Sequence, residues 1–303
     1  MNEVQAAPRS LPRLLLAGAR PRTLPASLVP VAIGAAAVPG GLSWWKVLAC
    51  GLVALSLQVG TNFANDYSDG VRGTDAERVG PLRLVGSGLV PPRTVAAAAA
   101  AAFALAAAFG LALAAASSWW LLAVGATAIA AGYLYTGGPR PYGYLGLGEV
   151  FVFTYFGLVA TLGTTYVQGH GVPVTSWCCG AASGLVAVAL LEANNVRDVE
   201  GDAMAGKRTL AVRVGARRAP WLYVLALVGA AIALATAGAV KPWLLAVSTL
   251  TALGSVQPSR AILSARRPPE FIAVLRRTST LQLAMGAACV VVERLLPIDI
   301  GQI

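Results

Sequence analysis

The stretch Asn62-Phe-Ala-Asn65-Asp66-Tyr-Ser-Asp69 closes a long apolar run, and Asn194-Asn195-Val-Arg-Asp198-Val-Glu-Gly-Asp202 closes a second one. Residues three and four apart share one face of a helix, so each stretch forms a polar stripe if it is helical. Charged side chains are costly beside hydrocarbon, and the few that occur there usually serve a function. The two stretches therefore indicate membrane helices that carry a functional site at their ends.

The composition around these stretches is that of an integral membrane protein. The chain has 303 residues, of which 57% are hydrophobic and 12% charged, and its mean hydropathy is +0.69. Apolar windows of about 18 to 23 residues are long enough to cross a bilayer. They predict a single domain (residues 1–303, with 1–20 as a flexible N-terminal tail), an all-α bundle of nine transmembrane helices at roughly 24–41, 45–65, 94–116, 119–136, 147–167, 174–195, 218–238, 242–262 and 273–293.

The basic residues predict the orientation, because Lys and Arg are retained on the cytoplasmic side. Twenty of them fall at one set of helix ends, and only Lys46, Lys241 and Arg294 fall at the other. We therefore expect a multi-pass protein of the cell membrane with a cytoplasmic N-terminus and an extracytoplasmic C-terminus. Contact with anionic lipid accounts for the net charge of +10, so no nucleic acid is expected as a partner.

Three other features are read as parts of the bundle. Residues 9–39 have the arginines and apolar run of a signal peptide, but eight further hydrophobic spans follow, so this run is expected to be the first helix. The four cysteines fall inside predicted spans without CxxC spacing, which indicates packing residues rather than disulfides or a zinc site. His170, the only histidine, falls in an outer loop, which excludes a histidine base on the cytoplasmic face.

The acidic residues are concentrated in the two polar stretches and the segments beside them. Eight of the thirteen lie there, namely Asp66, Asp69, Asp75, Glu77, Glu192, Asp198, Glu200 and Asp202. Asp66 and Asp198 stand 132 residues apart, each at the cytoplasmic end of an even-numbered predicted helix. This interval suggests a pseudo-repeat of four-helix units to which the ninth helix is an addition.

Carboxylates gathered in this way repel one another unless a cation joins them. Hard oxygen ligands suit Mg²⁺, which typically takes one or two carboxylates and completes its shell with water and phosphate oxygens. The remaining phosphate charge would be met by the basic residues interleaved with the acids, which are Arg72, Arg78, Lys207 and Arg208. The pattern predicts a diphosphate site. The alternative is that these segments are solvated interfacial loops whose acids balance the local arginines. Such loops do not require two asparagine-led stripes at helical spacing.

The two stretches, extended to Asn65-Asp66-Tyr-Ser-Asp69-Gly-Val-Arg-Gly-Thr-Asp75 and Asn195-Val-Arg-Asp198-Val-Glu-Gly-Asp202, resemble the paired aspartate-rich motifs of the UbiA superfamily of membrane prenyltransferases. The nine-helix hydropathy plan agrees, so the resemblance covers nearly the whole chain. It implies a helical bundle with a central cavity, capped on the cytoplasmic side by the loops after the second and sixth predicted helices. It also implies that both motifs bind Mg²⁺ and the diphosphate of an isoprenoid donor.

Further segments are similar to the branch of this superfamily that prenylates 1,4-dihydroxy-2-naphthoate. They are Arg20-Pro-Arg22-Thr-Leu-Pro-Ala-Ser, Arg78-Val-Gly-Pro-Leu-Arg83, Tyr135-Thr-Gly-Gly-Pro-Arg-Pro-Tyr142-Gly-Tyr-Leu-Gly-Leu-Gly-Glu149 and Gly206-Lys207-Arg-Thr209-Leu-Ala-Val-Arg-Val-Gly215. The resemblance implies an aromatic polyprenyltransferase that releases carbon dioxide and diphosphate and forms demethylmenaquinol, in menaquinone biosynthesis. A UbiA-type reaction on another aromatic acceptor, such as 4-hydroxybenzoate, is the alternative.

The resemblance also implies roles for single residues. The metal ligands would be Asn65, Asp66, Asp69, Asn195, Asp198 and Asp202, and the catalytic set would be Asp66, Asp69, Asp198, Asp202 and Lys207. Diphosphate would be held by Arg72, Arg78, Lys207 and Arg208. The acceptor would meet Arg22, Tyr135, Arg140 and Tyr142, with Asn62 and Asp75 in support. The expected partners are a polyprenyl diphosphate, an aromatic acid and the lipid bilayer.

Three other classes of membrane protein explain the sequence less well. A CDP-alcohol phosphotransferase also begins its motif as Asp66-x-x-Asp69-Gly70, but Gly73-Thr74 stands where that class has Ala-Arg. A secondary transporter would place paired polar helix ends near the midplane of the bilayer, whereas these acids lie at its cytoplasmic boundary. A structural scaffold would not need the polar stripes. No spacing in the sequence measures the length of the prenyl chain or sets the oligomeric state.

Overall fold

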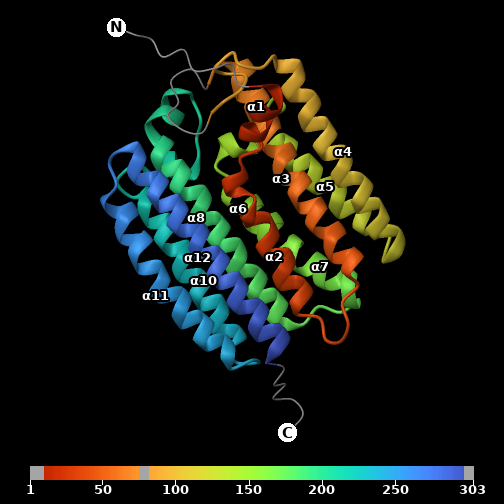
Figure 1. The fold of residues 1–303 in the computed structure, drawn as a ribbon. Coiled ribbons are helices and arrows are strands. Elements are labelled where there is room, and N and C mark those ends of the chain that lie inside the picture. Colours follow the sequence, from red (N-terminus) through yellow and green to blue (C-terminus); the bar gives the residue numbers. More distant parts are fainter. Residues whose placement is uncertain (1–9, 75–81, 297–303) are drawn as a thin grey trace.

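The computed structural model describes residues 10–74 and 82–296, which form a bundle of helices without any β-strand (Figure 1). The main helices are α1 (Leu11–Gly18), α2 (Pro25–Ala36), α3 (Trp44–Arg72), α4 (Pro92–Ala116), α5 (Leu121–Leu134), α6 (Gly148–Val152), α7 (Ala160–Gly169), α8 (Val174–Met204), α9 (Leu210–Val214), α10 (Ala219–Ala237), α11 (Trp243–Ser264) and α12 (Pro268–Leu295). Most of these helices overlap the predicted windows, whereas α1 and α9 lie outside them. Two short 3₁₀ turns, η1 (Pro21–Thr23) and η2 (Tyr142–Leu145), precede α2 and α6.

Five of the helical segments in the described part of the chain are long and apolar enough to cross a membrane. They are α3, α4, the run Gly148–Gly169, α8 and α10. Two further apolar helices, α2 and α5, are shorter than 18 residues. The protein is therefore a multi-pass helical membrane protein.

The run Gly148–Gly169 is one continuous helix with a wide π turn, η3 (Phe153–Val159), between α6 and α7. Within η3, Gly157 lies so close to α8 that a Cβ atom on it would come within 2.5 Å of the Cα of Gly184. A π turn adds a residue to a helix turn and commonly marks a functional site. This close contact holds the helix that carries Phe151 and Tyr155 against α8, and both side chains line the cavity described below.

The helices α3 and α8 extend past the apolar windows and include the whole of the two polar stretches. The windows predicted helices to residues 65 and 195, whereas α3 ends at Arg72 and α8 at Met204. Both extensions stay helical because their polar side chains face the interior of the bundle, where Asp69 and Asp202 are 1% and 7% exposed. The last turns of α3 and α8 lie at the same end of the bundle, opposite the end of α12 (Figure 1).

The N-terminal helix α1 lies within the stretch that was predicted as a tail. Its Leu14 is buried, and packs with Phe63 and Leu84 in one hydrophobic cluster. A Cβ atom on Gly18, the last residue of α1, would come within 2.7 Å of Leu84 and 2.9 Å of Phe63. Residues 11–18 are therefore a folded part of the bundle that packs against the polar end of α3.

Candidate active site

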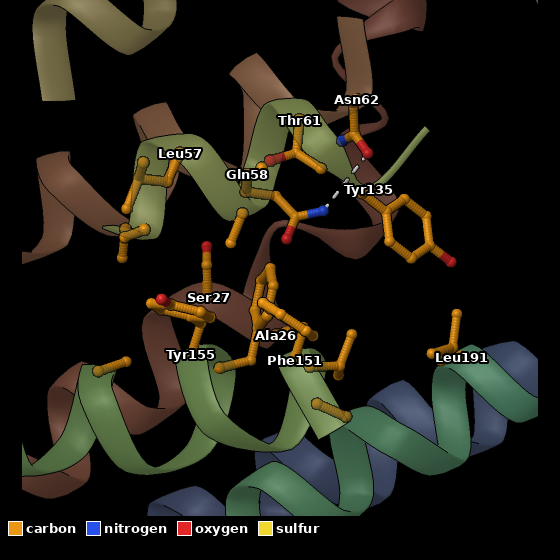
Figure 2. Close-up of a pocket in the computed structure, with 18 of the residues that line it drawn as sticks. Ala26, Ser27, Leu57, Gln58, Thr61, Asn62, Tyr135, Phe151, Tyr155 and Leu191 are labelled. Atoms are coloured by element: carbon orange, nitrogen blue, oxygen red, sulfur yellow. Dashed lines mark hydrogen bonds between the residues drawn. The ribbon is translucent and has the colours of Figure 1, made fainter. Parts of the chain in front are cut away.

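A cavity of about 390 Å³ lies between the last turns of α3 and α8 and continues along α5 and α7. Figure 2 shows Gln58, Thr61 and Asn62 of α3 on one side of it and Phe151 and Tyr155 on the other. Its polar end is lined by Asn62, Asn65, Asp69, Arg83, Asn194, Asn195, Asp202 and Lys207. The rest is an apolar arm, which is lined by residues such as Val53, Leu57, Leu113, Leu121, Val124, Ala128, Val159 and Val167. The shape suits a ligand with a charged head and a hydrocarbon tail.

Lys207 joins the two polar stretches. Its Nζ atom lies 3.6 Å from Asp69 Oδ2 and 3.6 Å from Asp202 Oδ1, and its side chain is 6% exposed. The chain reverses directly after α8, where Gly206 has a φ of +74° that a residue with a side chain rarely adopts. Because one ammonium group pairs with a carboxylate from each helix, the ends of α3 and α8 share a single site.

Asp69 is held by groups from three other segments. The Tyr144 hydroxyl donates to Asp69 Oδ1 at 2.6 Å, and Arg83 Nη2 lies 3.6 Å from Asp69 Oδ2. Burial, and then the negative charge of Asp69, raise the pKa of Tyr144 to about 12, so this hydroxyl stays a donor at physiological pH. The Lys207 ammonium also lies 4.8 Å from the centre of the Tyr144 ring, within the range of a cation–π contact. Asp69 is therefore fixed in orientation by donors around it.

Two of the predicted metal ligands do not line the cavity. Asp66 is 1% exposed, and its two oxygens accept the backbone N–H groups of Leu84 and Val85 at 2.8 and 3.0 Å. Asp198 forms a two-point ion pair with its neighbour Arg197 at 2.7 and 2.8 Å, and it is Arg197 that lines the cavity. Within the described part of the chain, the carboxylates that reach the cavity are those of Asp69 and Asp202.

The amides of Asn65 and Asn195 line the cavity from opposite helices. Asn65 Oδ1 accepts the Thr136 hydroxyl at 2.8 Å, and Asn195 Nδ2 donates to Glu149 Oε1 at 3.0 Å. A carboxylate can only accept, so Glu149 requires the NH₂ group of Asn195 on its side and leaves the amide oxygen for other partners. Asn62, predicted as a supporting residue, donates to the carbonyl of Ala19 at 3.0 Å and ties the chain before η1 to α3.

The basic residues predicted for diphosphate separate into different groups. Lys207 lines the cavity, whereas the Arg72 guanidinium donates to the carbonyls of Thr136 and Gly138, and Arg208 is exposed. Arg72 thereby holds the loop after α5 rather than facing the cavity. Arg78 and Asp75 lie outside the described residues, and so does the side chain of Arg22.

The predicted acceptor residues contribute two aromatic rings to the cavity. Tyr135 and Tyr142 both line it, and their rings meet edge to face with centres 5.5 Å apart. Tyr142 also stacks on Phe151 at 3.9 Å, and burial raises the pKa of its hydroxyl, which donates to the carbonyl of Ala131 at 2.9 Å. Arg140 is exposed and does not line the cavity. The aromatic cluster can cover a flat ring and exclude water.

Several cavity residues were not assigned a role from the sequence. Arg83, Tyr144 and Thr136 contact the predicted polar residues, and Arg20 lines the cavity beside Thr23 of η1. Arg20 has a left-handed backbone with a φ of +55°, which is uncommon for a residue other than glycine. Arg83, Tyr144, Thr136 and Arg20 all fall inside the segments quoted for the resemblance, but nothing in their spacing shows which side chains turn inward.

The donors at the polar end fit a magnesium ion. Two carboxylates with amide oxygens are hard oxygen ligands, and Mg²⁺ usually takes only one or two carboxylates from the protein. The position of Lys207 between Asp69 and Asp202 shows that this place attracts a cation. Among the residues that the structure describes, no three His, Cys, Asp or Glu side chains gather into a cluster, so the protein would supply carboxylates in a pair.

A helical membrane bundle that encloses a cation-lined polar site with an apolar arm defines a class of enzymes that act on lipid-like substrates with an anionic head. A sequence profile of the UbiA prenyltransferase family matches residues 27–281. The chain belongs to this family, and it is a membrane prenyltransferase. Solved structures of the fold agree, although their sequences are distant. A UbiA homologue from Archaeoglobus fulgidus, bound to GPP and Mg²⁺, has a TM-score of 0.68 at 19% identity and covers 91% of this chain and 99% of its own.

Curated relatives are much more similar in sequence. A Mycobacterium tuberculosis protein named 1,4-dihydroxy-2-naphthoate octaprenyltransferase is 46% identical over 275 residues, which are 90% of this chain and 94% of the relative. A Bacillus subtilis protein of the same name is 32% identical and is matched over 94% of both chains. The likeness therefore runs through the whole bundle and includes both polar stretches.

Proposed function

We propose that this protein transfers a polyprenyl group from polyprenyl diphosphate to 1,4-dihydroxy-2-naphthoate, with Mg²⁺ as its cofactor. Carbon dioxide and diphosphate leave, and demethylmenaquinol forms for menaquinone biosynthesis. The observation that carries the proposal is the pairing of Lys207 with both Asp69 and Asp202 at the head of an apolar arm. The names of the curated relatives support the choice of acceptor.

The donor would place its diphosphate at the polar end and its hydrocarbon chain in the apolar arm. Asp69 and Asp202, with the amide oxygens of Asn65 and Asn195, would hold the metal. Bound there, Mg²⁺ supplies positive charge that stabilises a departing diphosphate. Lys207 and Arg83 would meet the phosphate oxygens that remain, because their cationic groups already line this end of the cavity. Fixed cations in a site shielded from water stabilise a leaving anion by several kcal/mol.

The reaction can be written with all atoms accounted for. The bond between the allylic carbon and oxygen breaks, and its electron pair leaves with diphosphate. A ring carbon of the acceptor then bonds to the allylic carbon. The carboxylate on that ring carbon leaves as carbon dioxide, and its bonding pair returns to the ring. Tyr135, Tyr142 and Phe151 would cover the acceptor ring and keep water from the allylic cation.

We also propose that nine helical segments cross the membrane, with the N-terminus in the cytoplasm and the C-terminus outside. The positions of α2, α5, α11 and α12 beside the five longer apolar spans support this count. The segments after α3 and α8 would then cap the cavity on the cytoplasmic side. The similar placement of the two polar stretches, each on the last turns of a long helix, supports a duplicated four-helix unit.

The purified protein should be offered Mg²⁺, one polyprenyl diphosphate and a panel of aromatic acids, and its products identified by mass. The proposal predicts a product of dihydroxynaphthoate that has lost its carboxylate. If 4-hydroxybenzoate is the only acid that is prenylated, and its product retains the carboxylate, the alternative reaction of the same family is favoured. In the same assay, the purified Asp69→Asn variant should form no product, whereas Arg276→Gln, a change on the exposed face of α12, should leave the product unchanged.

A further inference from the structure

Asp66 occupies a position that its sequence motif does not explain. It follows Asn65 directly on α3, and one residue turns a helix by about 100°, so it points away from the face that carries Asn65. Both of its carboxylate oxygens accept backbone N–H groups, from Leu84 at 2.8 Å and from Val85 at 3.0 Å. The side chain is buried, and it is not part of the cavity wall.

The segment that Asp66 holds is packed tightly against α3. Leu84 and Val90 are 0% and 2% exposed. A Cβ atom on Gly70 would come within 2.5 Å of Val85 and 3.0 Å of the Gly86 nitrogen. Glycine at position 70 therefore lets the backbone of residues 84–86 approach α3 closely enough for the Asp66 carboxylate to bind it.

Arg83 is the residue directly before the two amides that Asp66 binds. Its guanidinium lines the cavity and lies 3.6 Å from Asp69 Oδ2. An arginine side chain has many rotamers, and its placement depends on a fixed backbone. A carboxylate that accepts two backbone N–H groups is a strong constraint of this kind, since hydrogen bonds to charged groups are among the stronger ones in proteins.

We infer that Asp66 is a positioning residue: its carboxylate anchors the backbone of Leu84 and Val85 to α3 and so places the Arg83 guanidinium beside Asp69 at the polar end of the cavity. Asp66 therefore positions Arg83, which contacts the donor, and is not itself a metal ligand. The role of Arg83 toward a diphosphate rests on the proposed function, whereas the anchoring of residues 84–85 does not.

Hydrogen–deuterium exchange of the substrate-free protein tests the anchor by itself. In Asp66→Asn the peptide over residues 82–90 should exchange faster, with Leu84 and Val85 gaining about tenfold or more, because one acceptor is replaced by an NH₂ group. Gly70→Ala should give a similar increase while it leaves the carboxylate intact. The matched control is Gly201→Ala, beside Asp202 on α8, where a Cβ atom meets nothing within 4 Å. Unchanged exchange in Asp66→Asn would overturn the inference.

A double-mutant cycle on donor binding tests the path through Arg83. The dissociation constant of a non-hydrolysable prenyl thiolodiphosphate with Mg²⁺ would be measured for Asp66→Asn, Arg83→Gln and the double variant. We expect about a tenfold or larger weakening in each single variant and no further loss in the double variant, because both changes remove one interaction. If the losses of affinity in the two single variants multiply in the double variant, and Asp66→Asn needs more Mg²⁺ for donor binding as Asp69→Asn does, then Asp66 is a metal ligand and the inference is overturned.

The two experiments separate the inference from the proposed function. If exchange responds as expected but no variant or native protein binds the thiolodiphosphate, the assignment of the cavity to a prenyl diphosphate fails, and with it the purpose given to Arg83. If the donor binds and exchange does not respond, the anchoring role of Asp66 fails and the proposed function stands.

Discussion

Replacement of Lys207 by glutamine would remove the ammonium group that pairs with both Asp202 and Asp69. Each carboxylate oxygen lies 3.6 Å from Nζ, and the three side chains are 2–9% exposed. At an effective dielectric constant near 20, each pair is worth at most about 5 kcal/mol before the cost of desolvation. Loss of one partner of a buried ion pair usually costs about 3–5 kcal/mol, because the remaining charge stays buried. We therefore expect a clear fall in the stability of Lys207→Gln without metal.

Magnesium should compensate for the missing ammonium group. If Mg²⁺ binds between Asp69 and Asp202, its charge offsets the repulsion between the two carboxylates that the loss of Lys207 leaves uncompensated. A ligand that binds only the folded state also raises the apparent stability. Apparent melting temperatures in detergent would be measured with and without Mg²⁺. The variant should gain more from Mg²⁺ than the native protein does. Its kcat/KM should still fall by about 10²- to 10³-fold, the usual effect of losing one group that stabilises a leaving anion.

A second ion pair, between the partly buried Lys241 and the buried Glu293, provides the control. Lys241 Nζ lies 2.5 Å from Glu293 Oε2, in a pair that lies away from the cavity. Lys241→Gln should lower the melting temperature as well, but Mg²⁺ should not restore it. Equal effects of Mg²⁺ on the native protein, Lys207→Gln and Lys241→Gln would refute the idea that the metal binds where Lys207 joins the two helices.

Three further outcomes are expected. Ala128→Phe should narrow the apolar arm, so KM should rise about tenfold or more for a long polyprenyl diphosphate and little for geranyl diphosphate. Equal effects on both donors would contradict the binding of the prenyl chain in the apolar arm. Arg83→Gln should raise KM for the donor more than KM for the acceptor, and the exposed Arg276→Gln should change neither. Backbone N–H groups of Arg266 and Arg267 lower the pKa of Glu270 to about 2, so its stabilising effect on the start of α12 should be present above pH 4.5 and be lost as the pH falls toward 2. In Glu270→Gln the melting temperature should lack this part of the pH dependence.

Much of the helical architecture could be predicted from the sequence because apolar windows of membrane length are a strong signal. The ends of α3 and α8 were missed, since a window of hydrophobic residues stops where polar residues begin. The polar residues continue the helix because they face a cavity and one another instead of lipid. Asp69 and Asp202 show this, as both are buried at the polar end.

The site could be predicted only in part, because helix periodicity shows which residues share a face of a helix but not which segment packs against that face. Asp66 was grouped with Asp69 on a polar stripe, yet it lies at the edge of that stripe and meets the backbone of Leu84 and Val85. Arginines were harder still. Arg72 turns to the carbonyls of Thr136 and Gly138, whereas Arg83 turns inward, and only tertiary contacts between distant segments decide between these outcomes.

A structure of the protein with Mn²⁺ and a non-hydrolysable prenyl thiolodiphosphate would test the shared site most directly. The account predicts an anomalous metal peak between Asp69 and Asp202, with the diphosphate next to Lys207 and the hydrocarbon chain along α5. A metal bound elsewhere, or a diphosphate that contacts only one of α3 and α8, would contradict it.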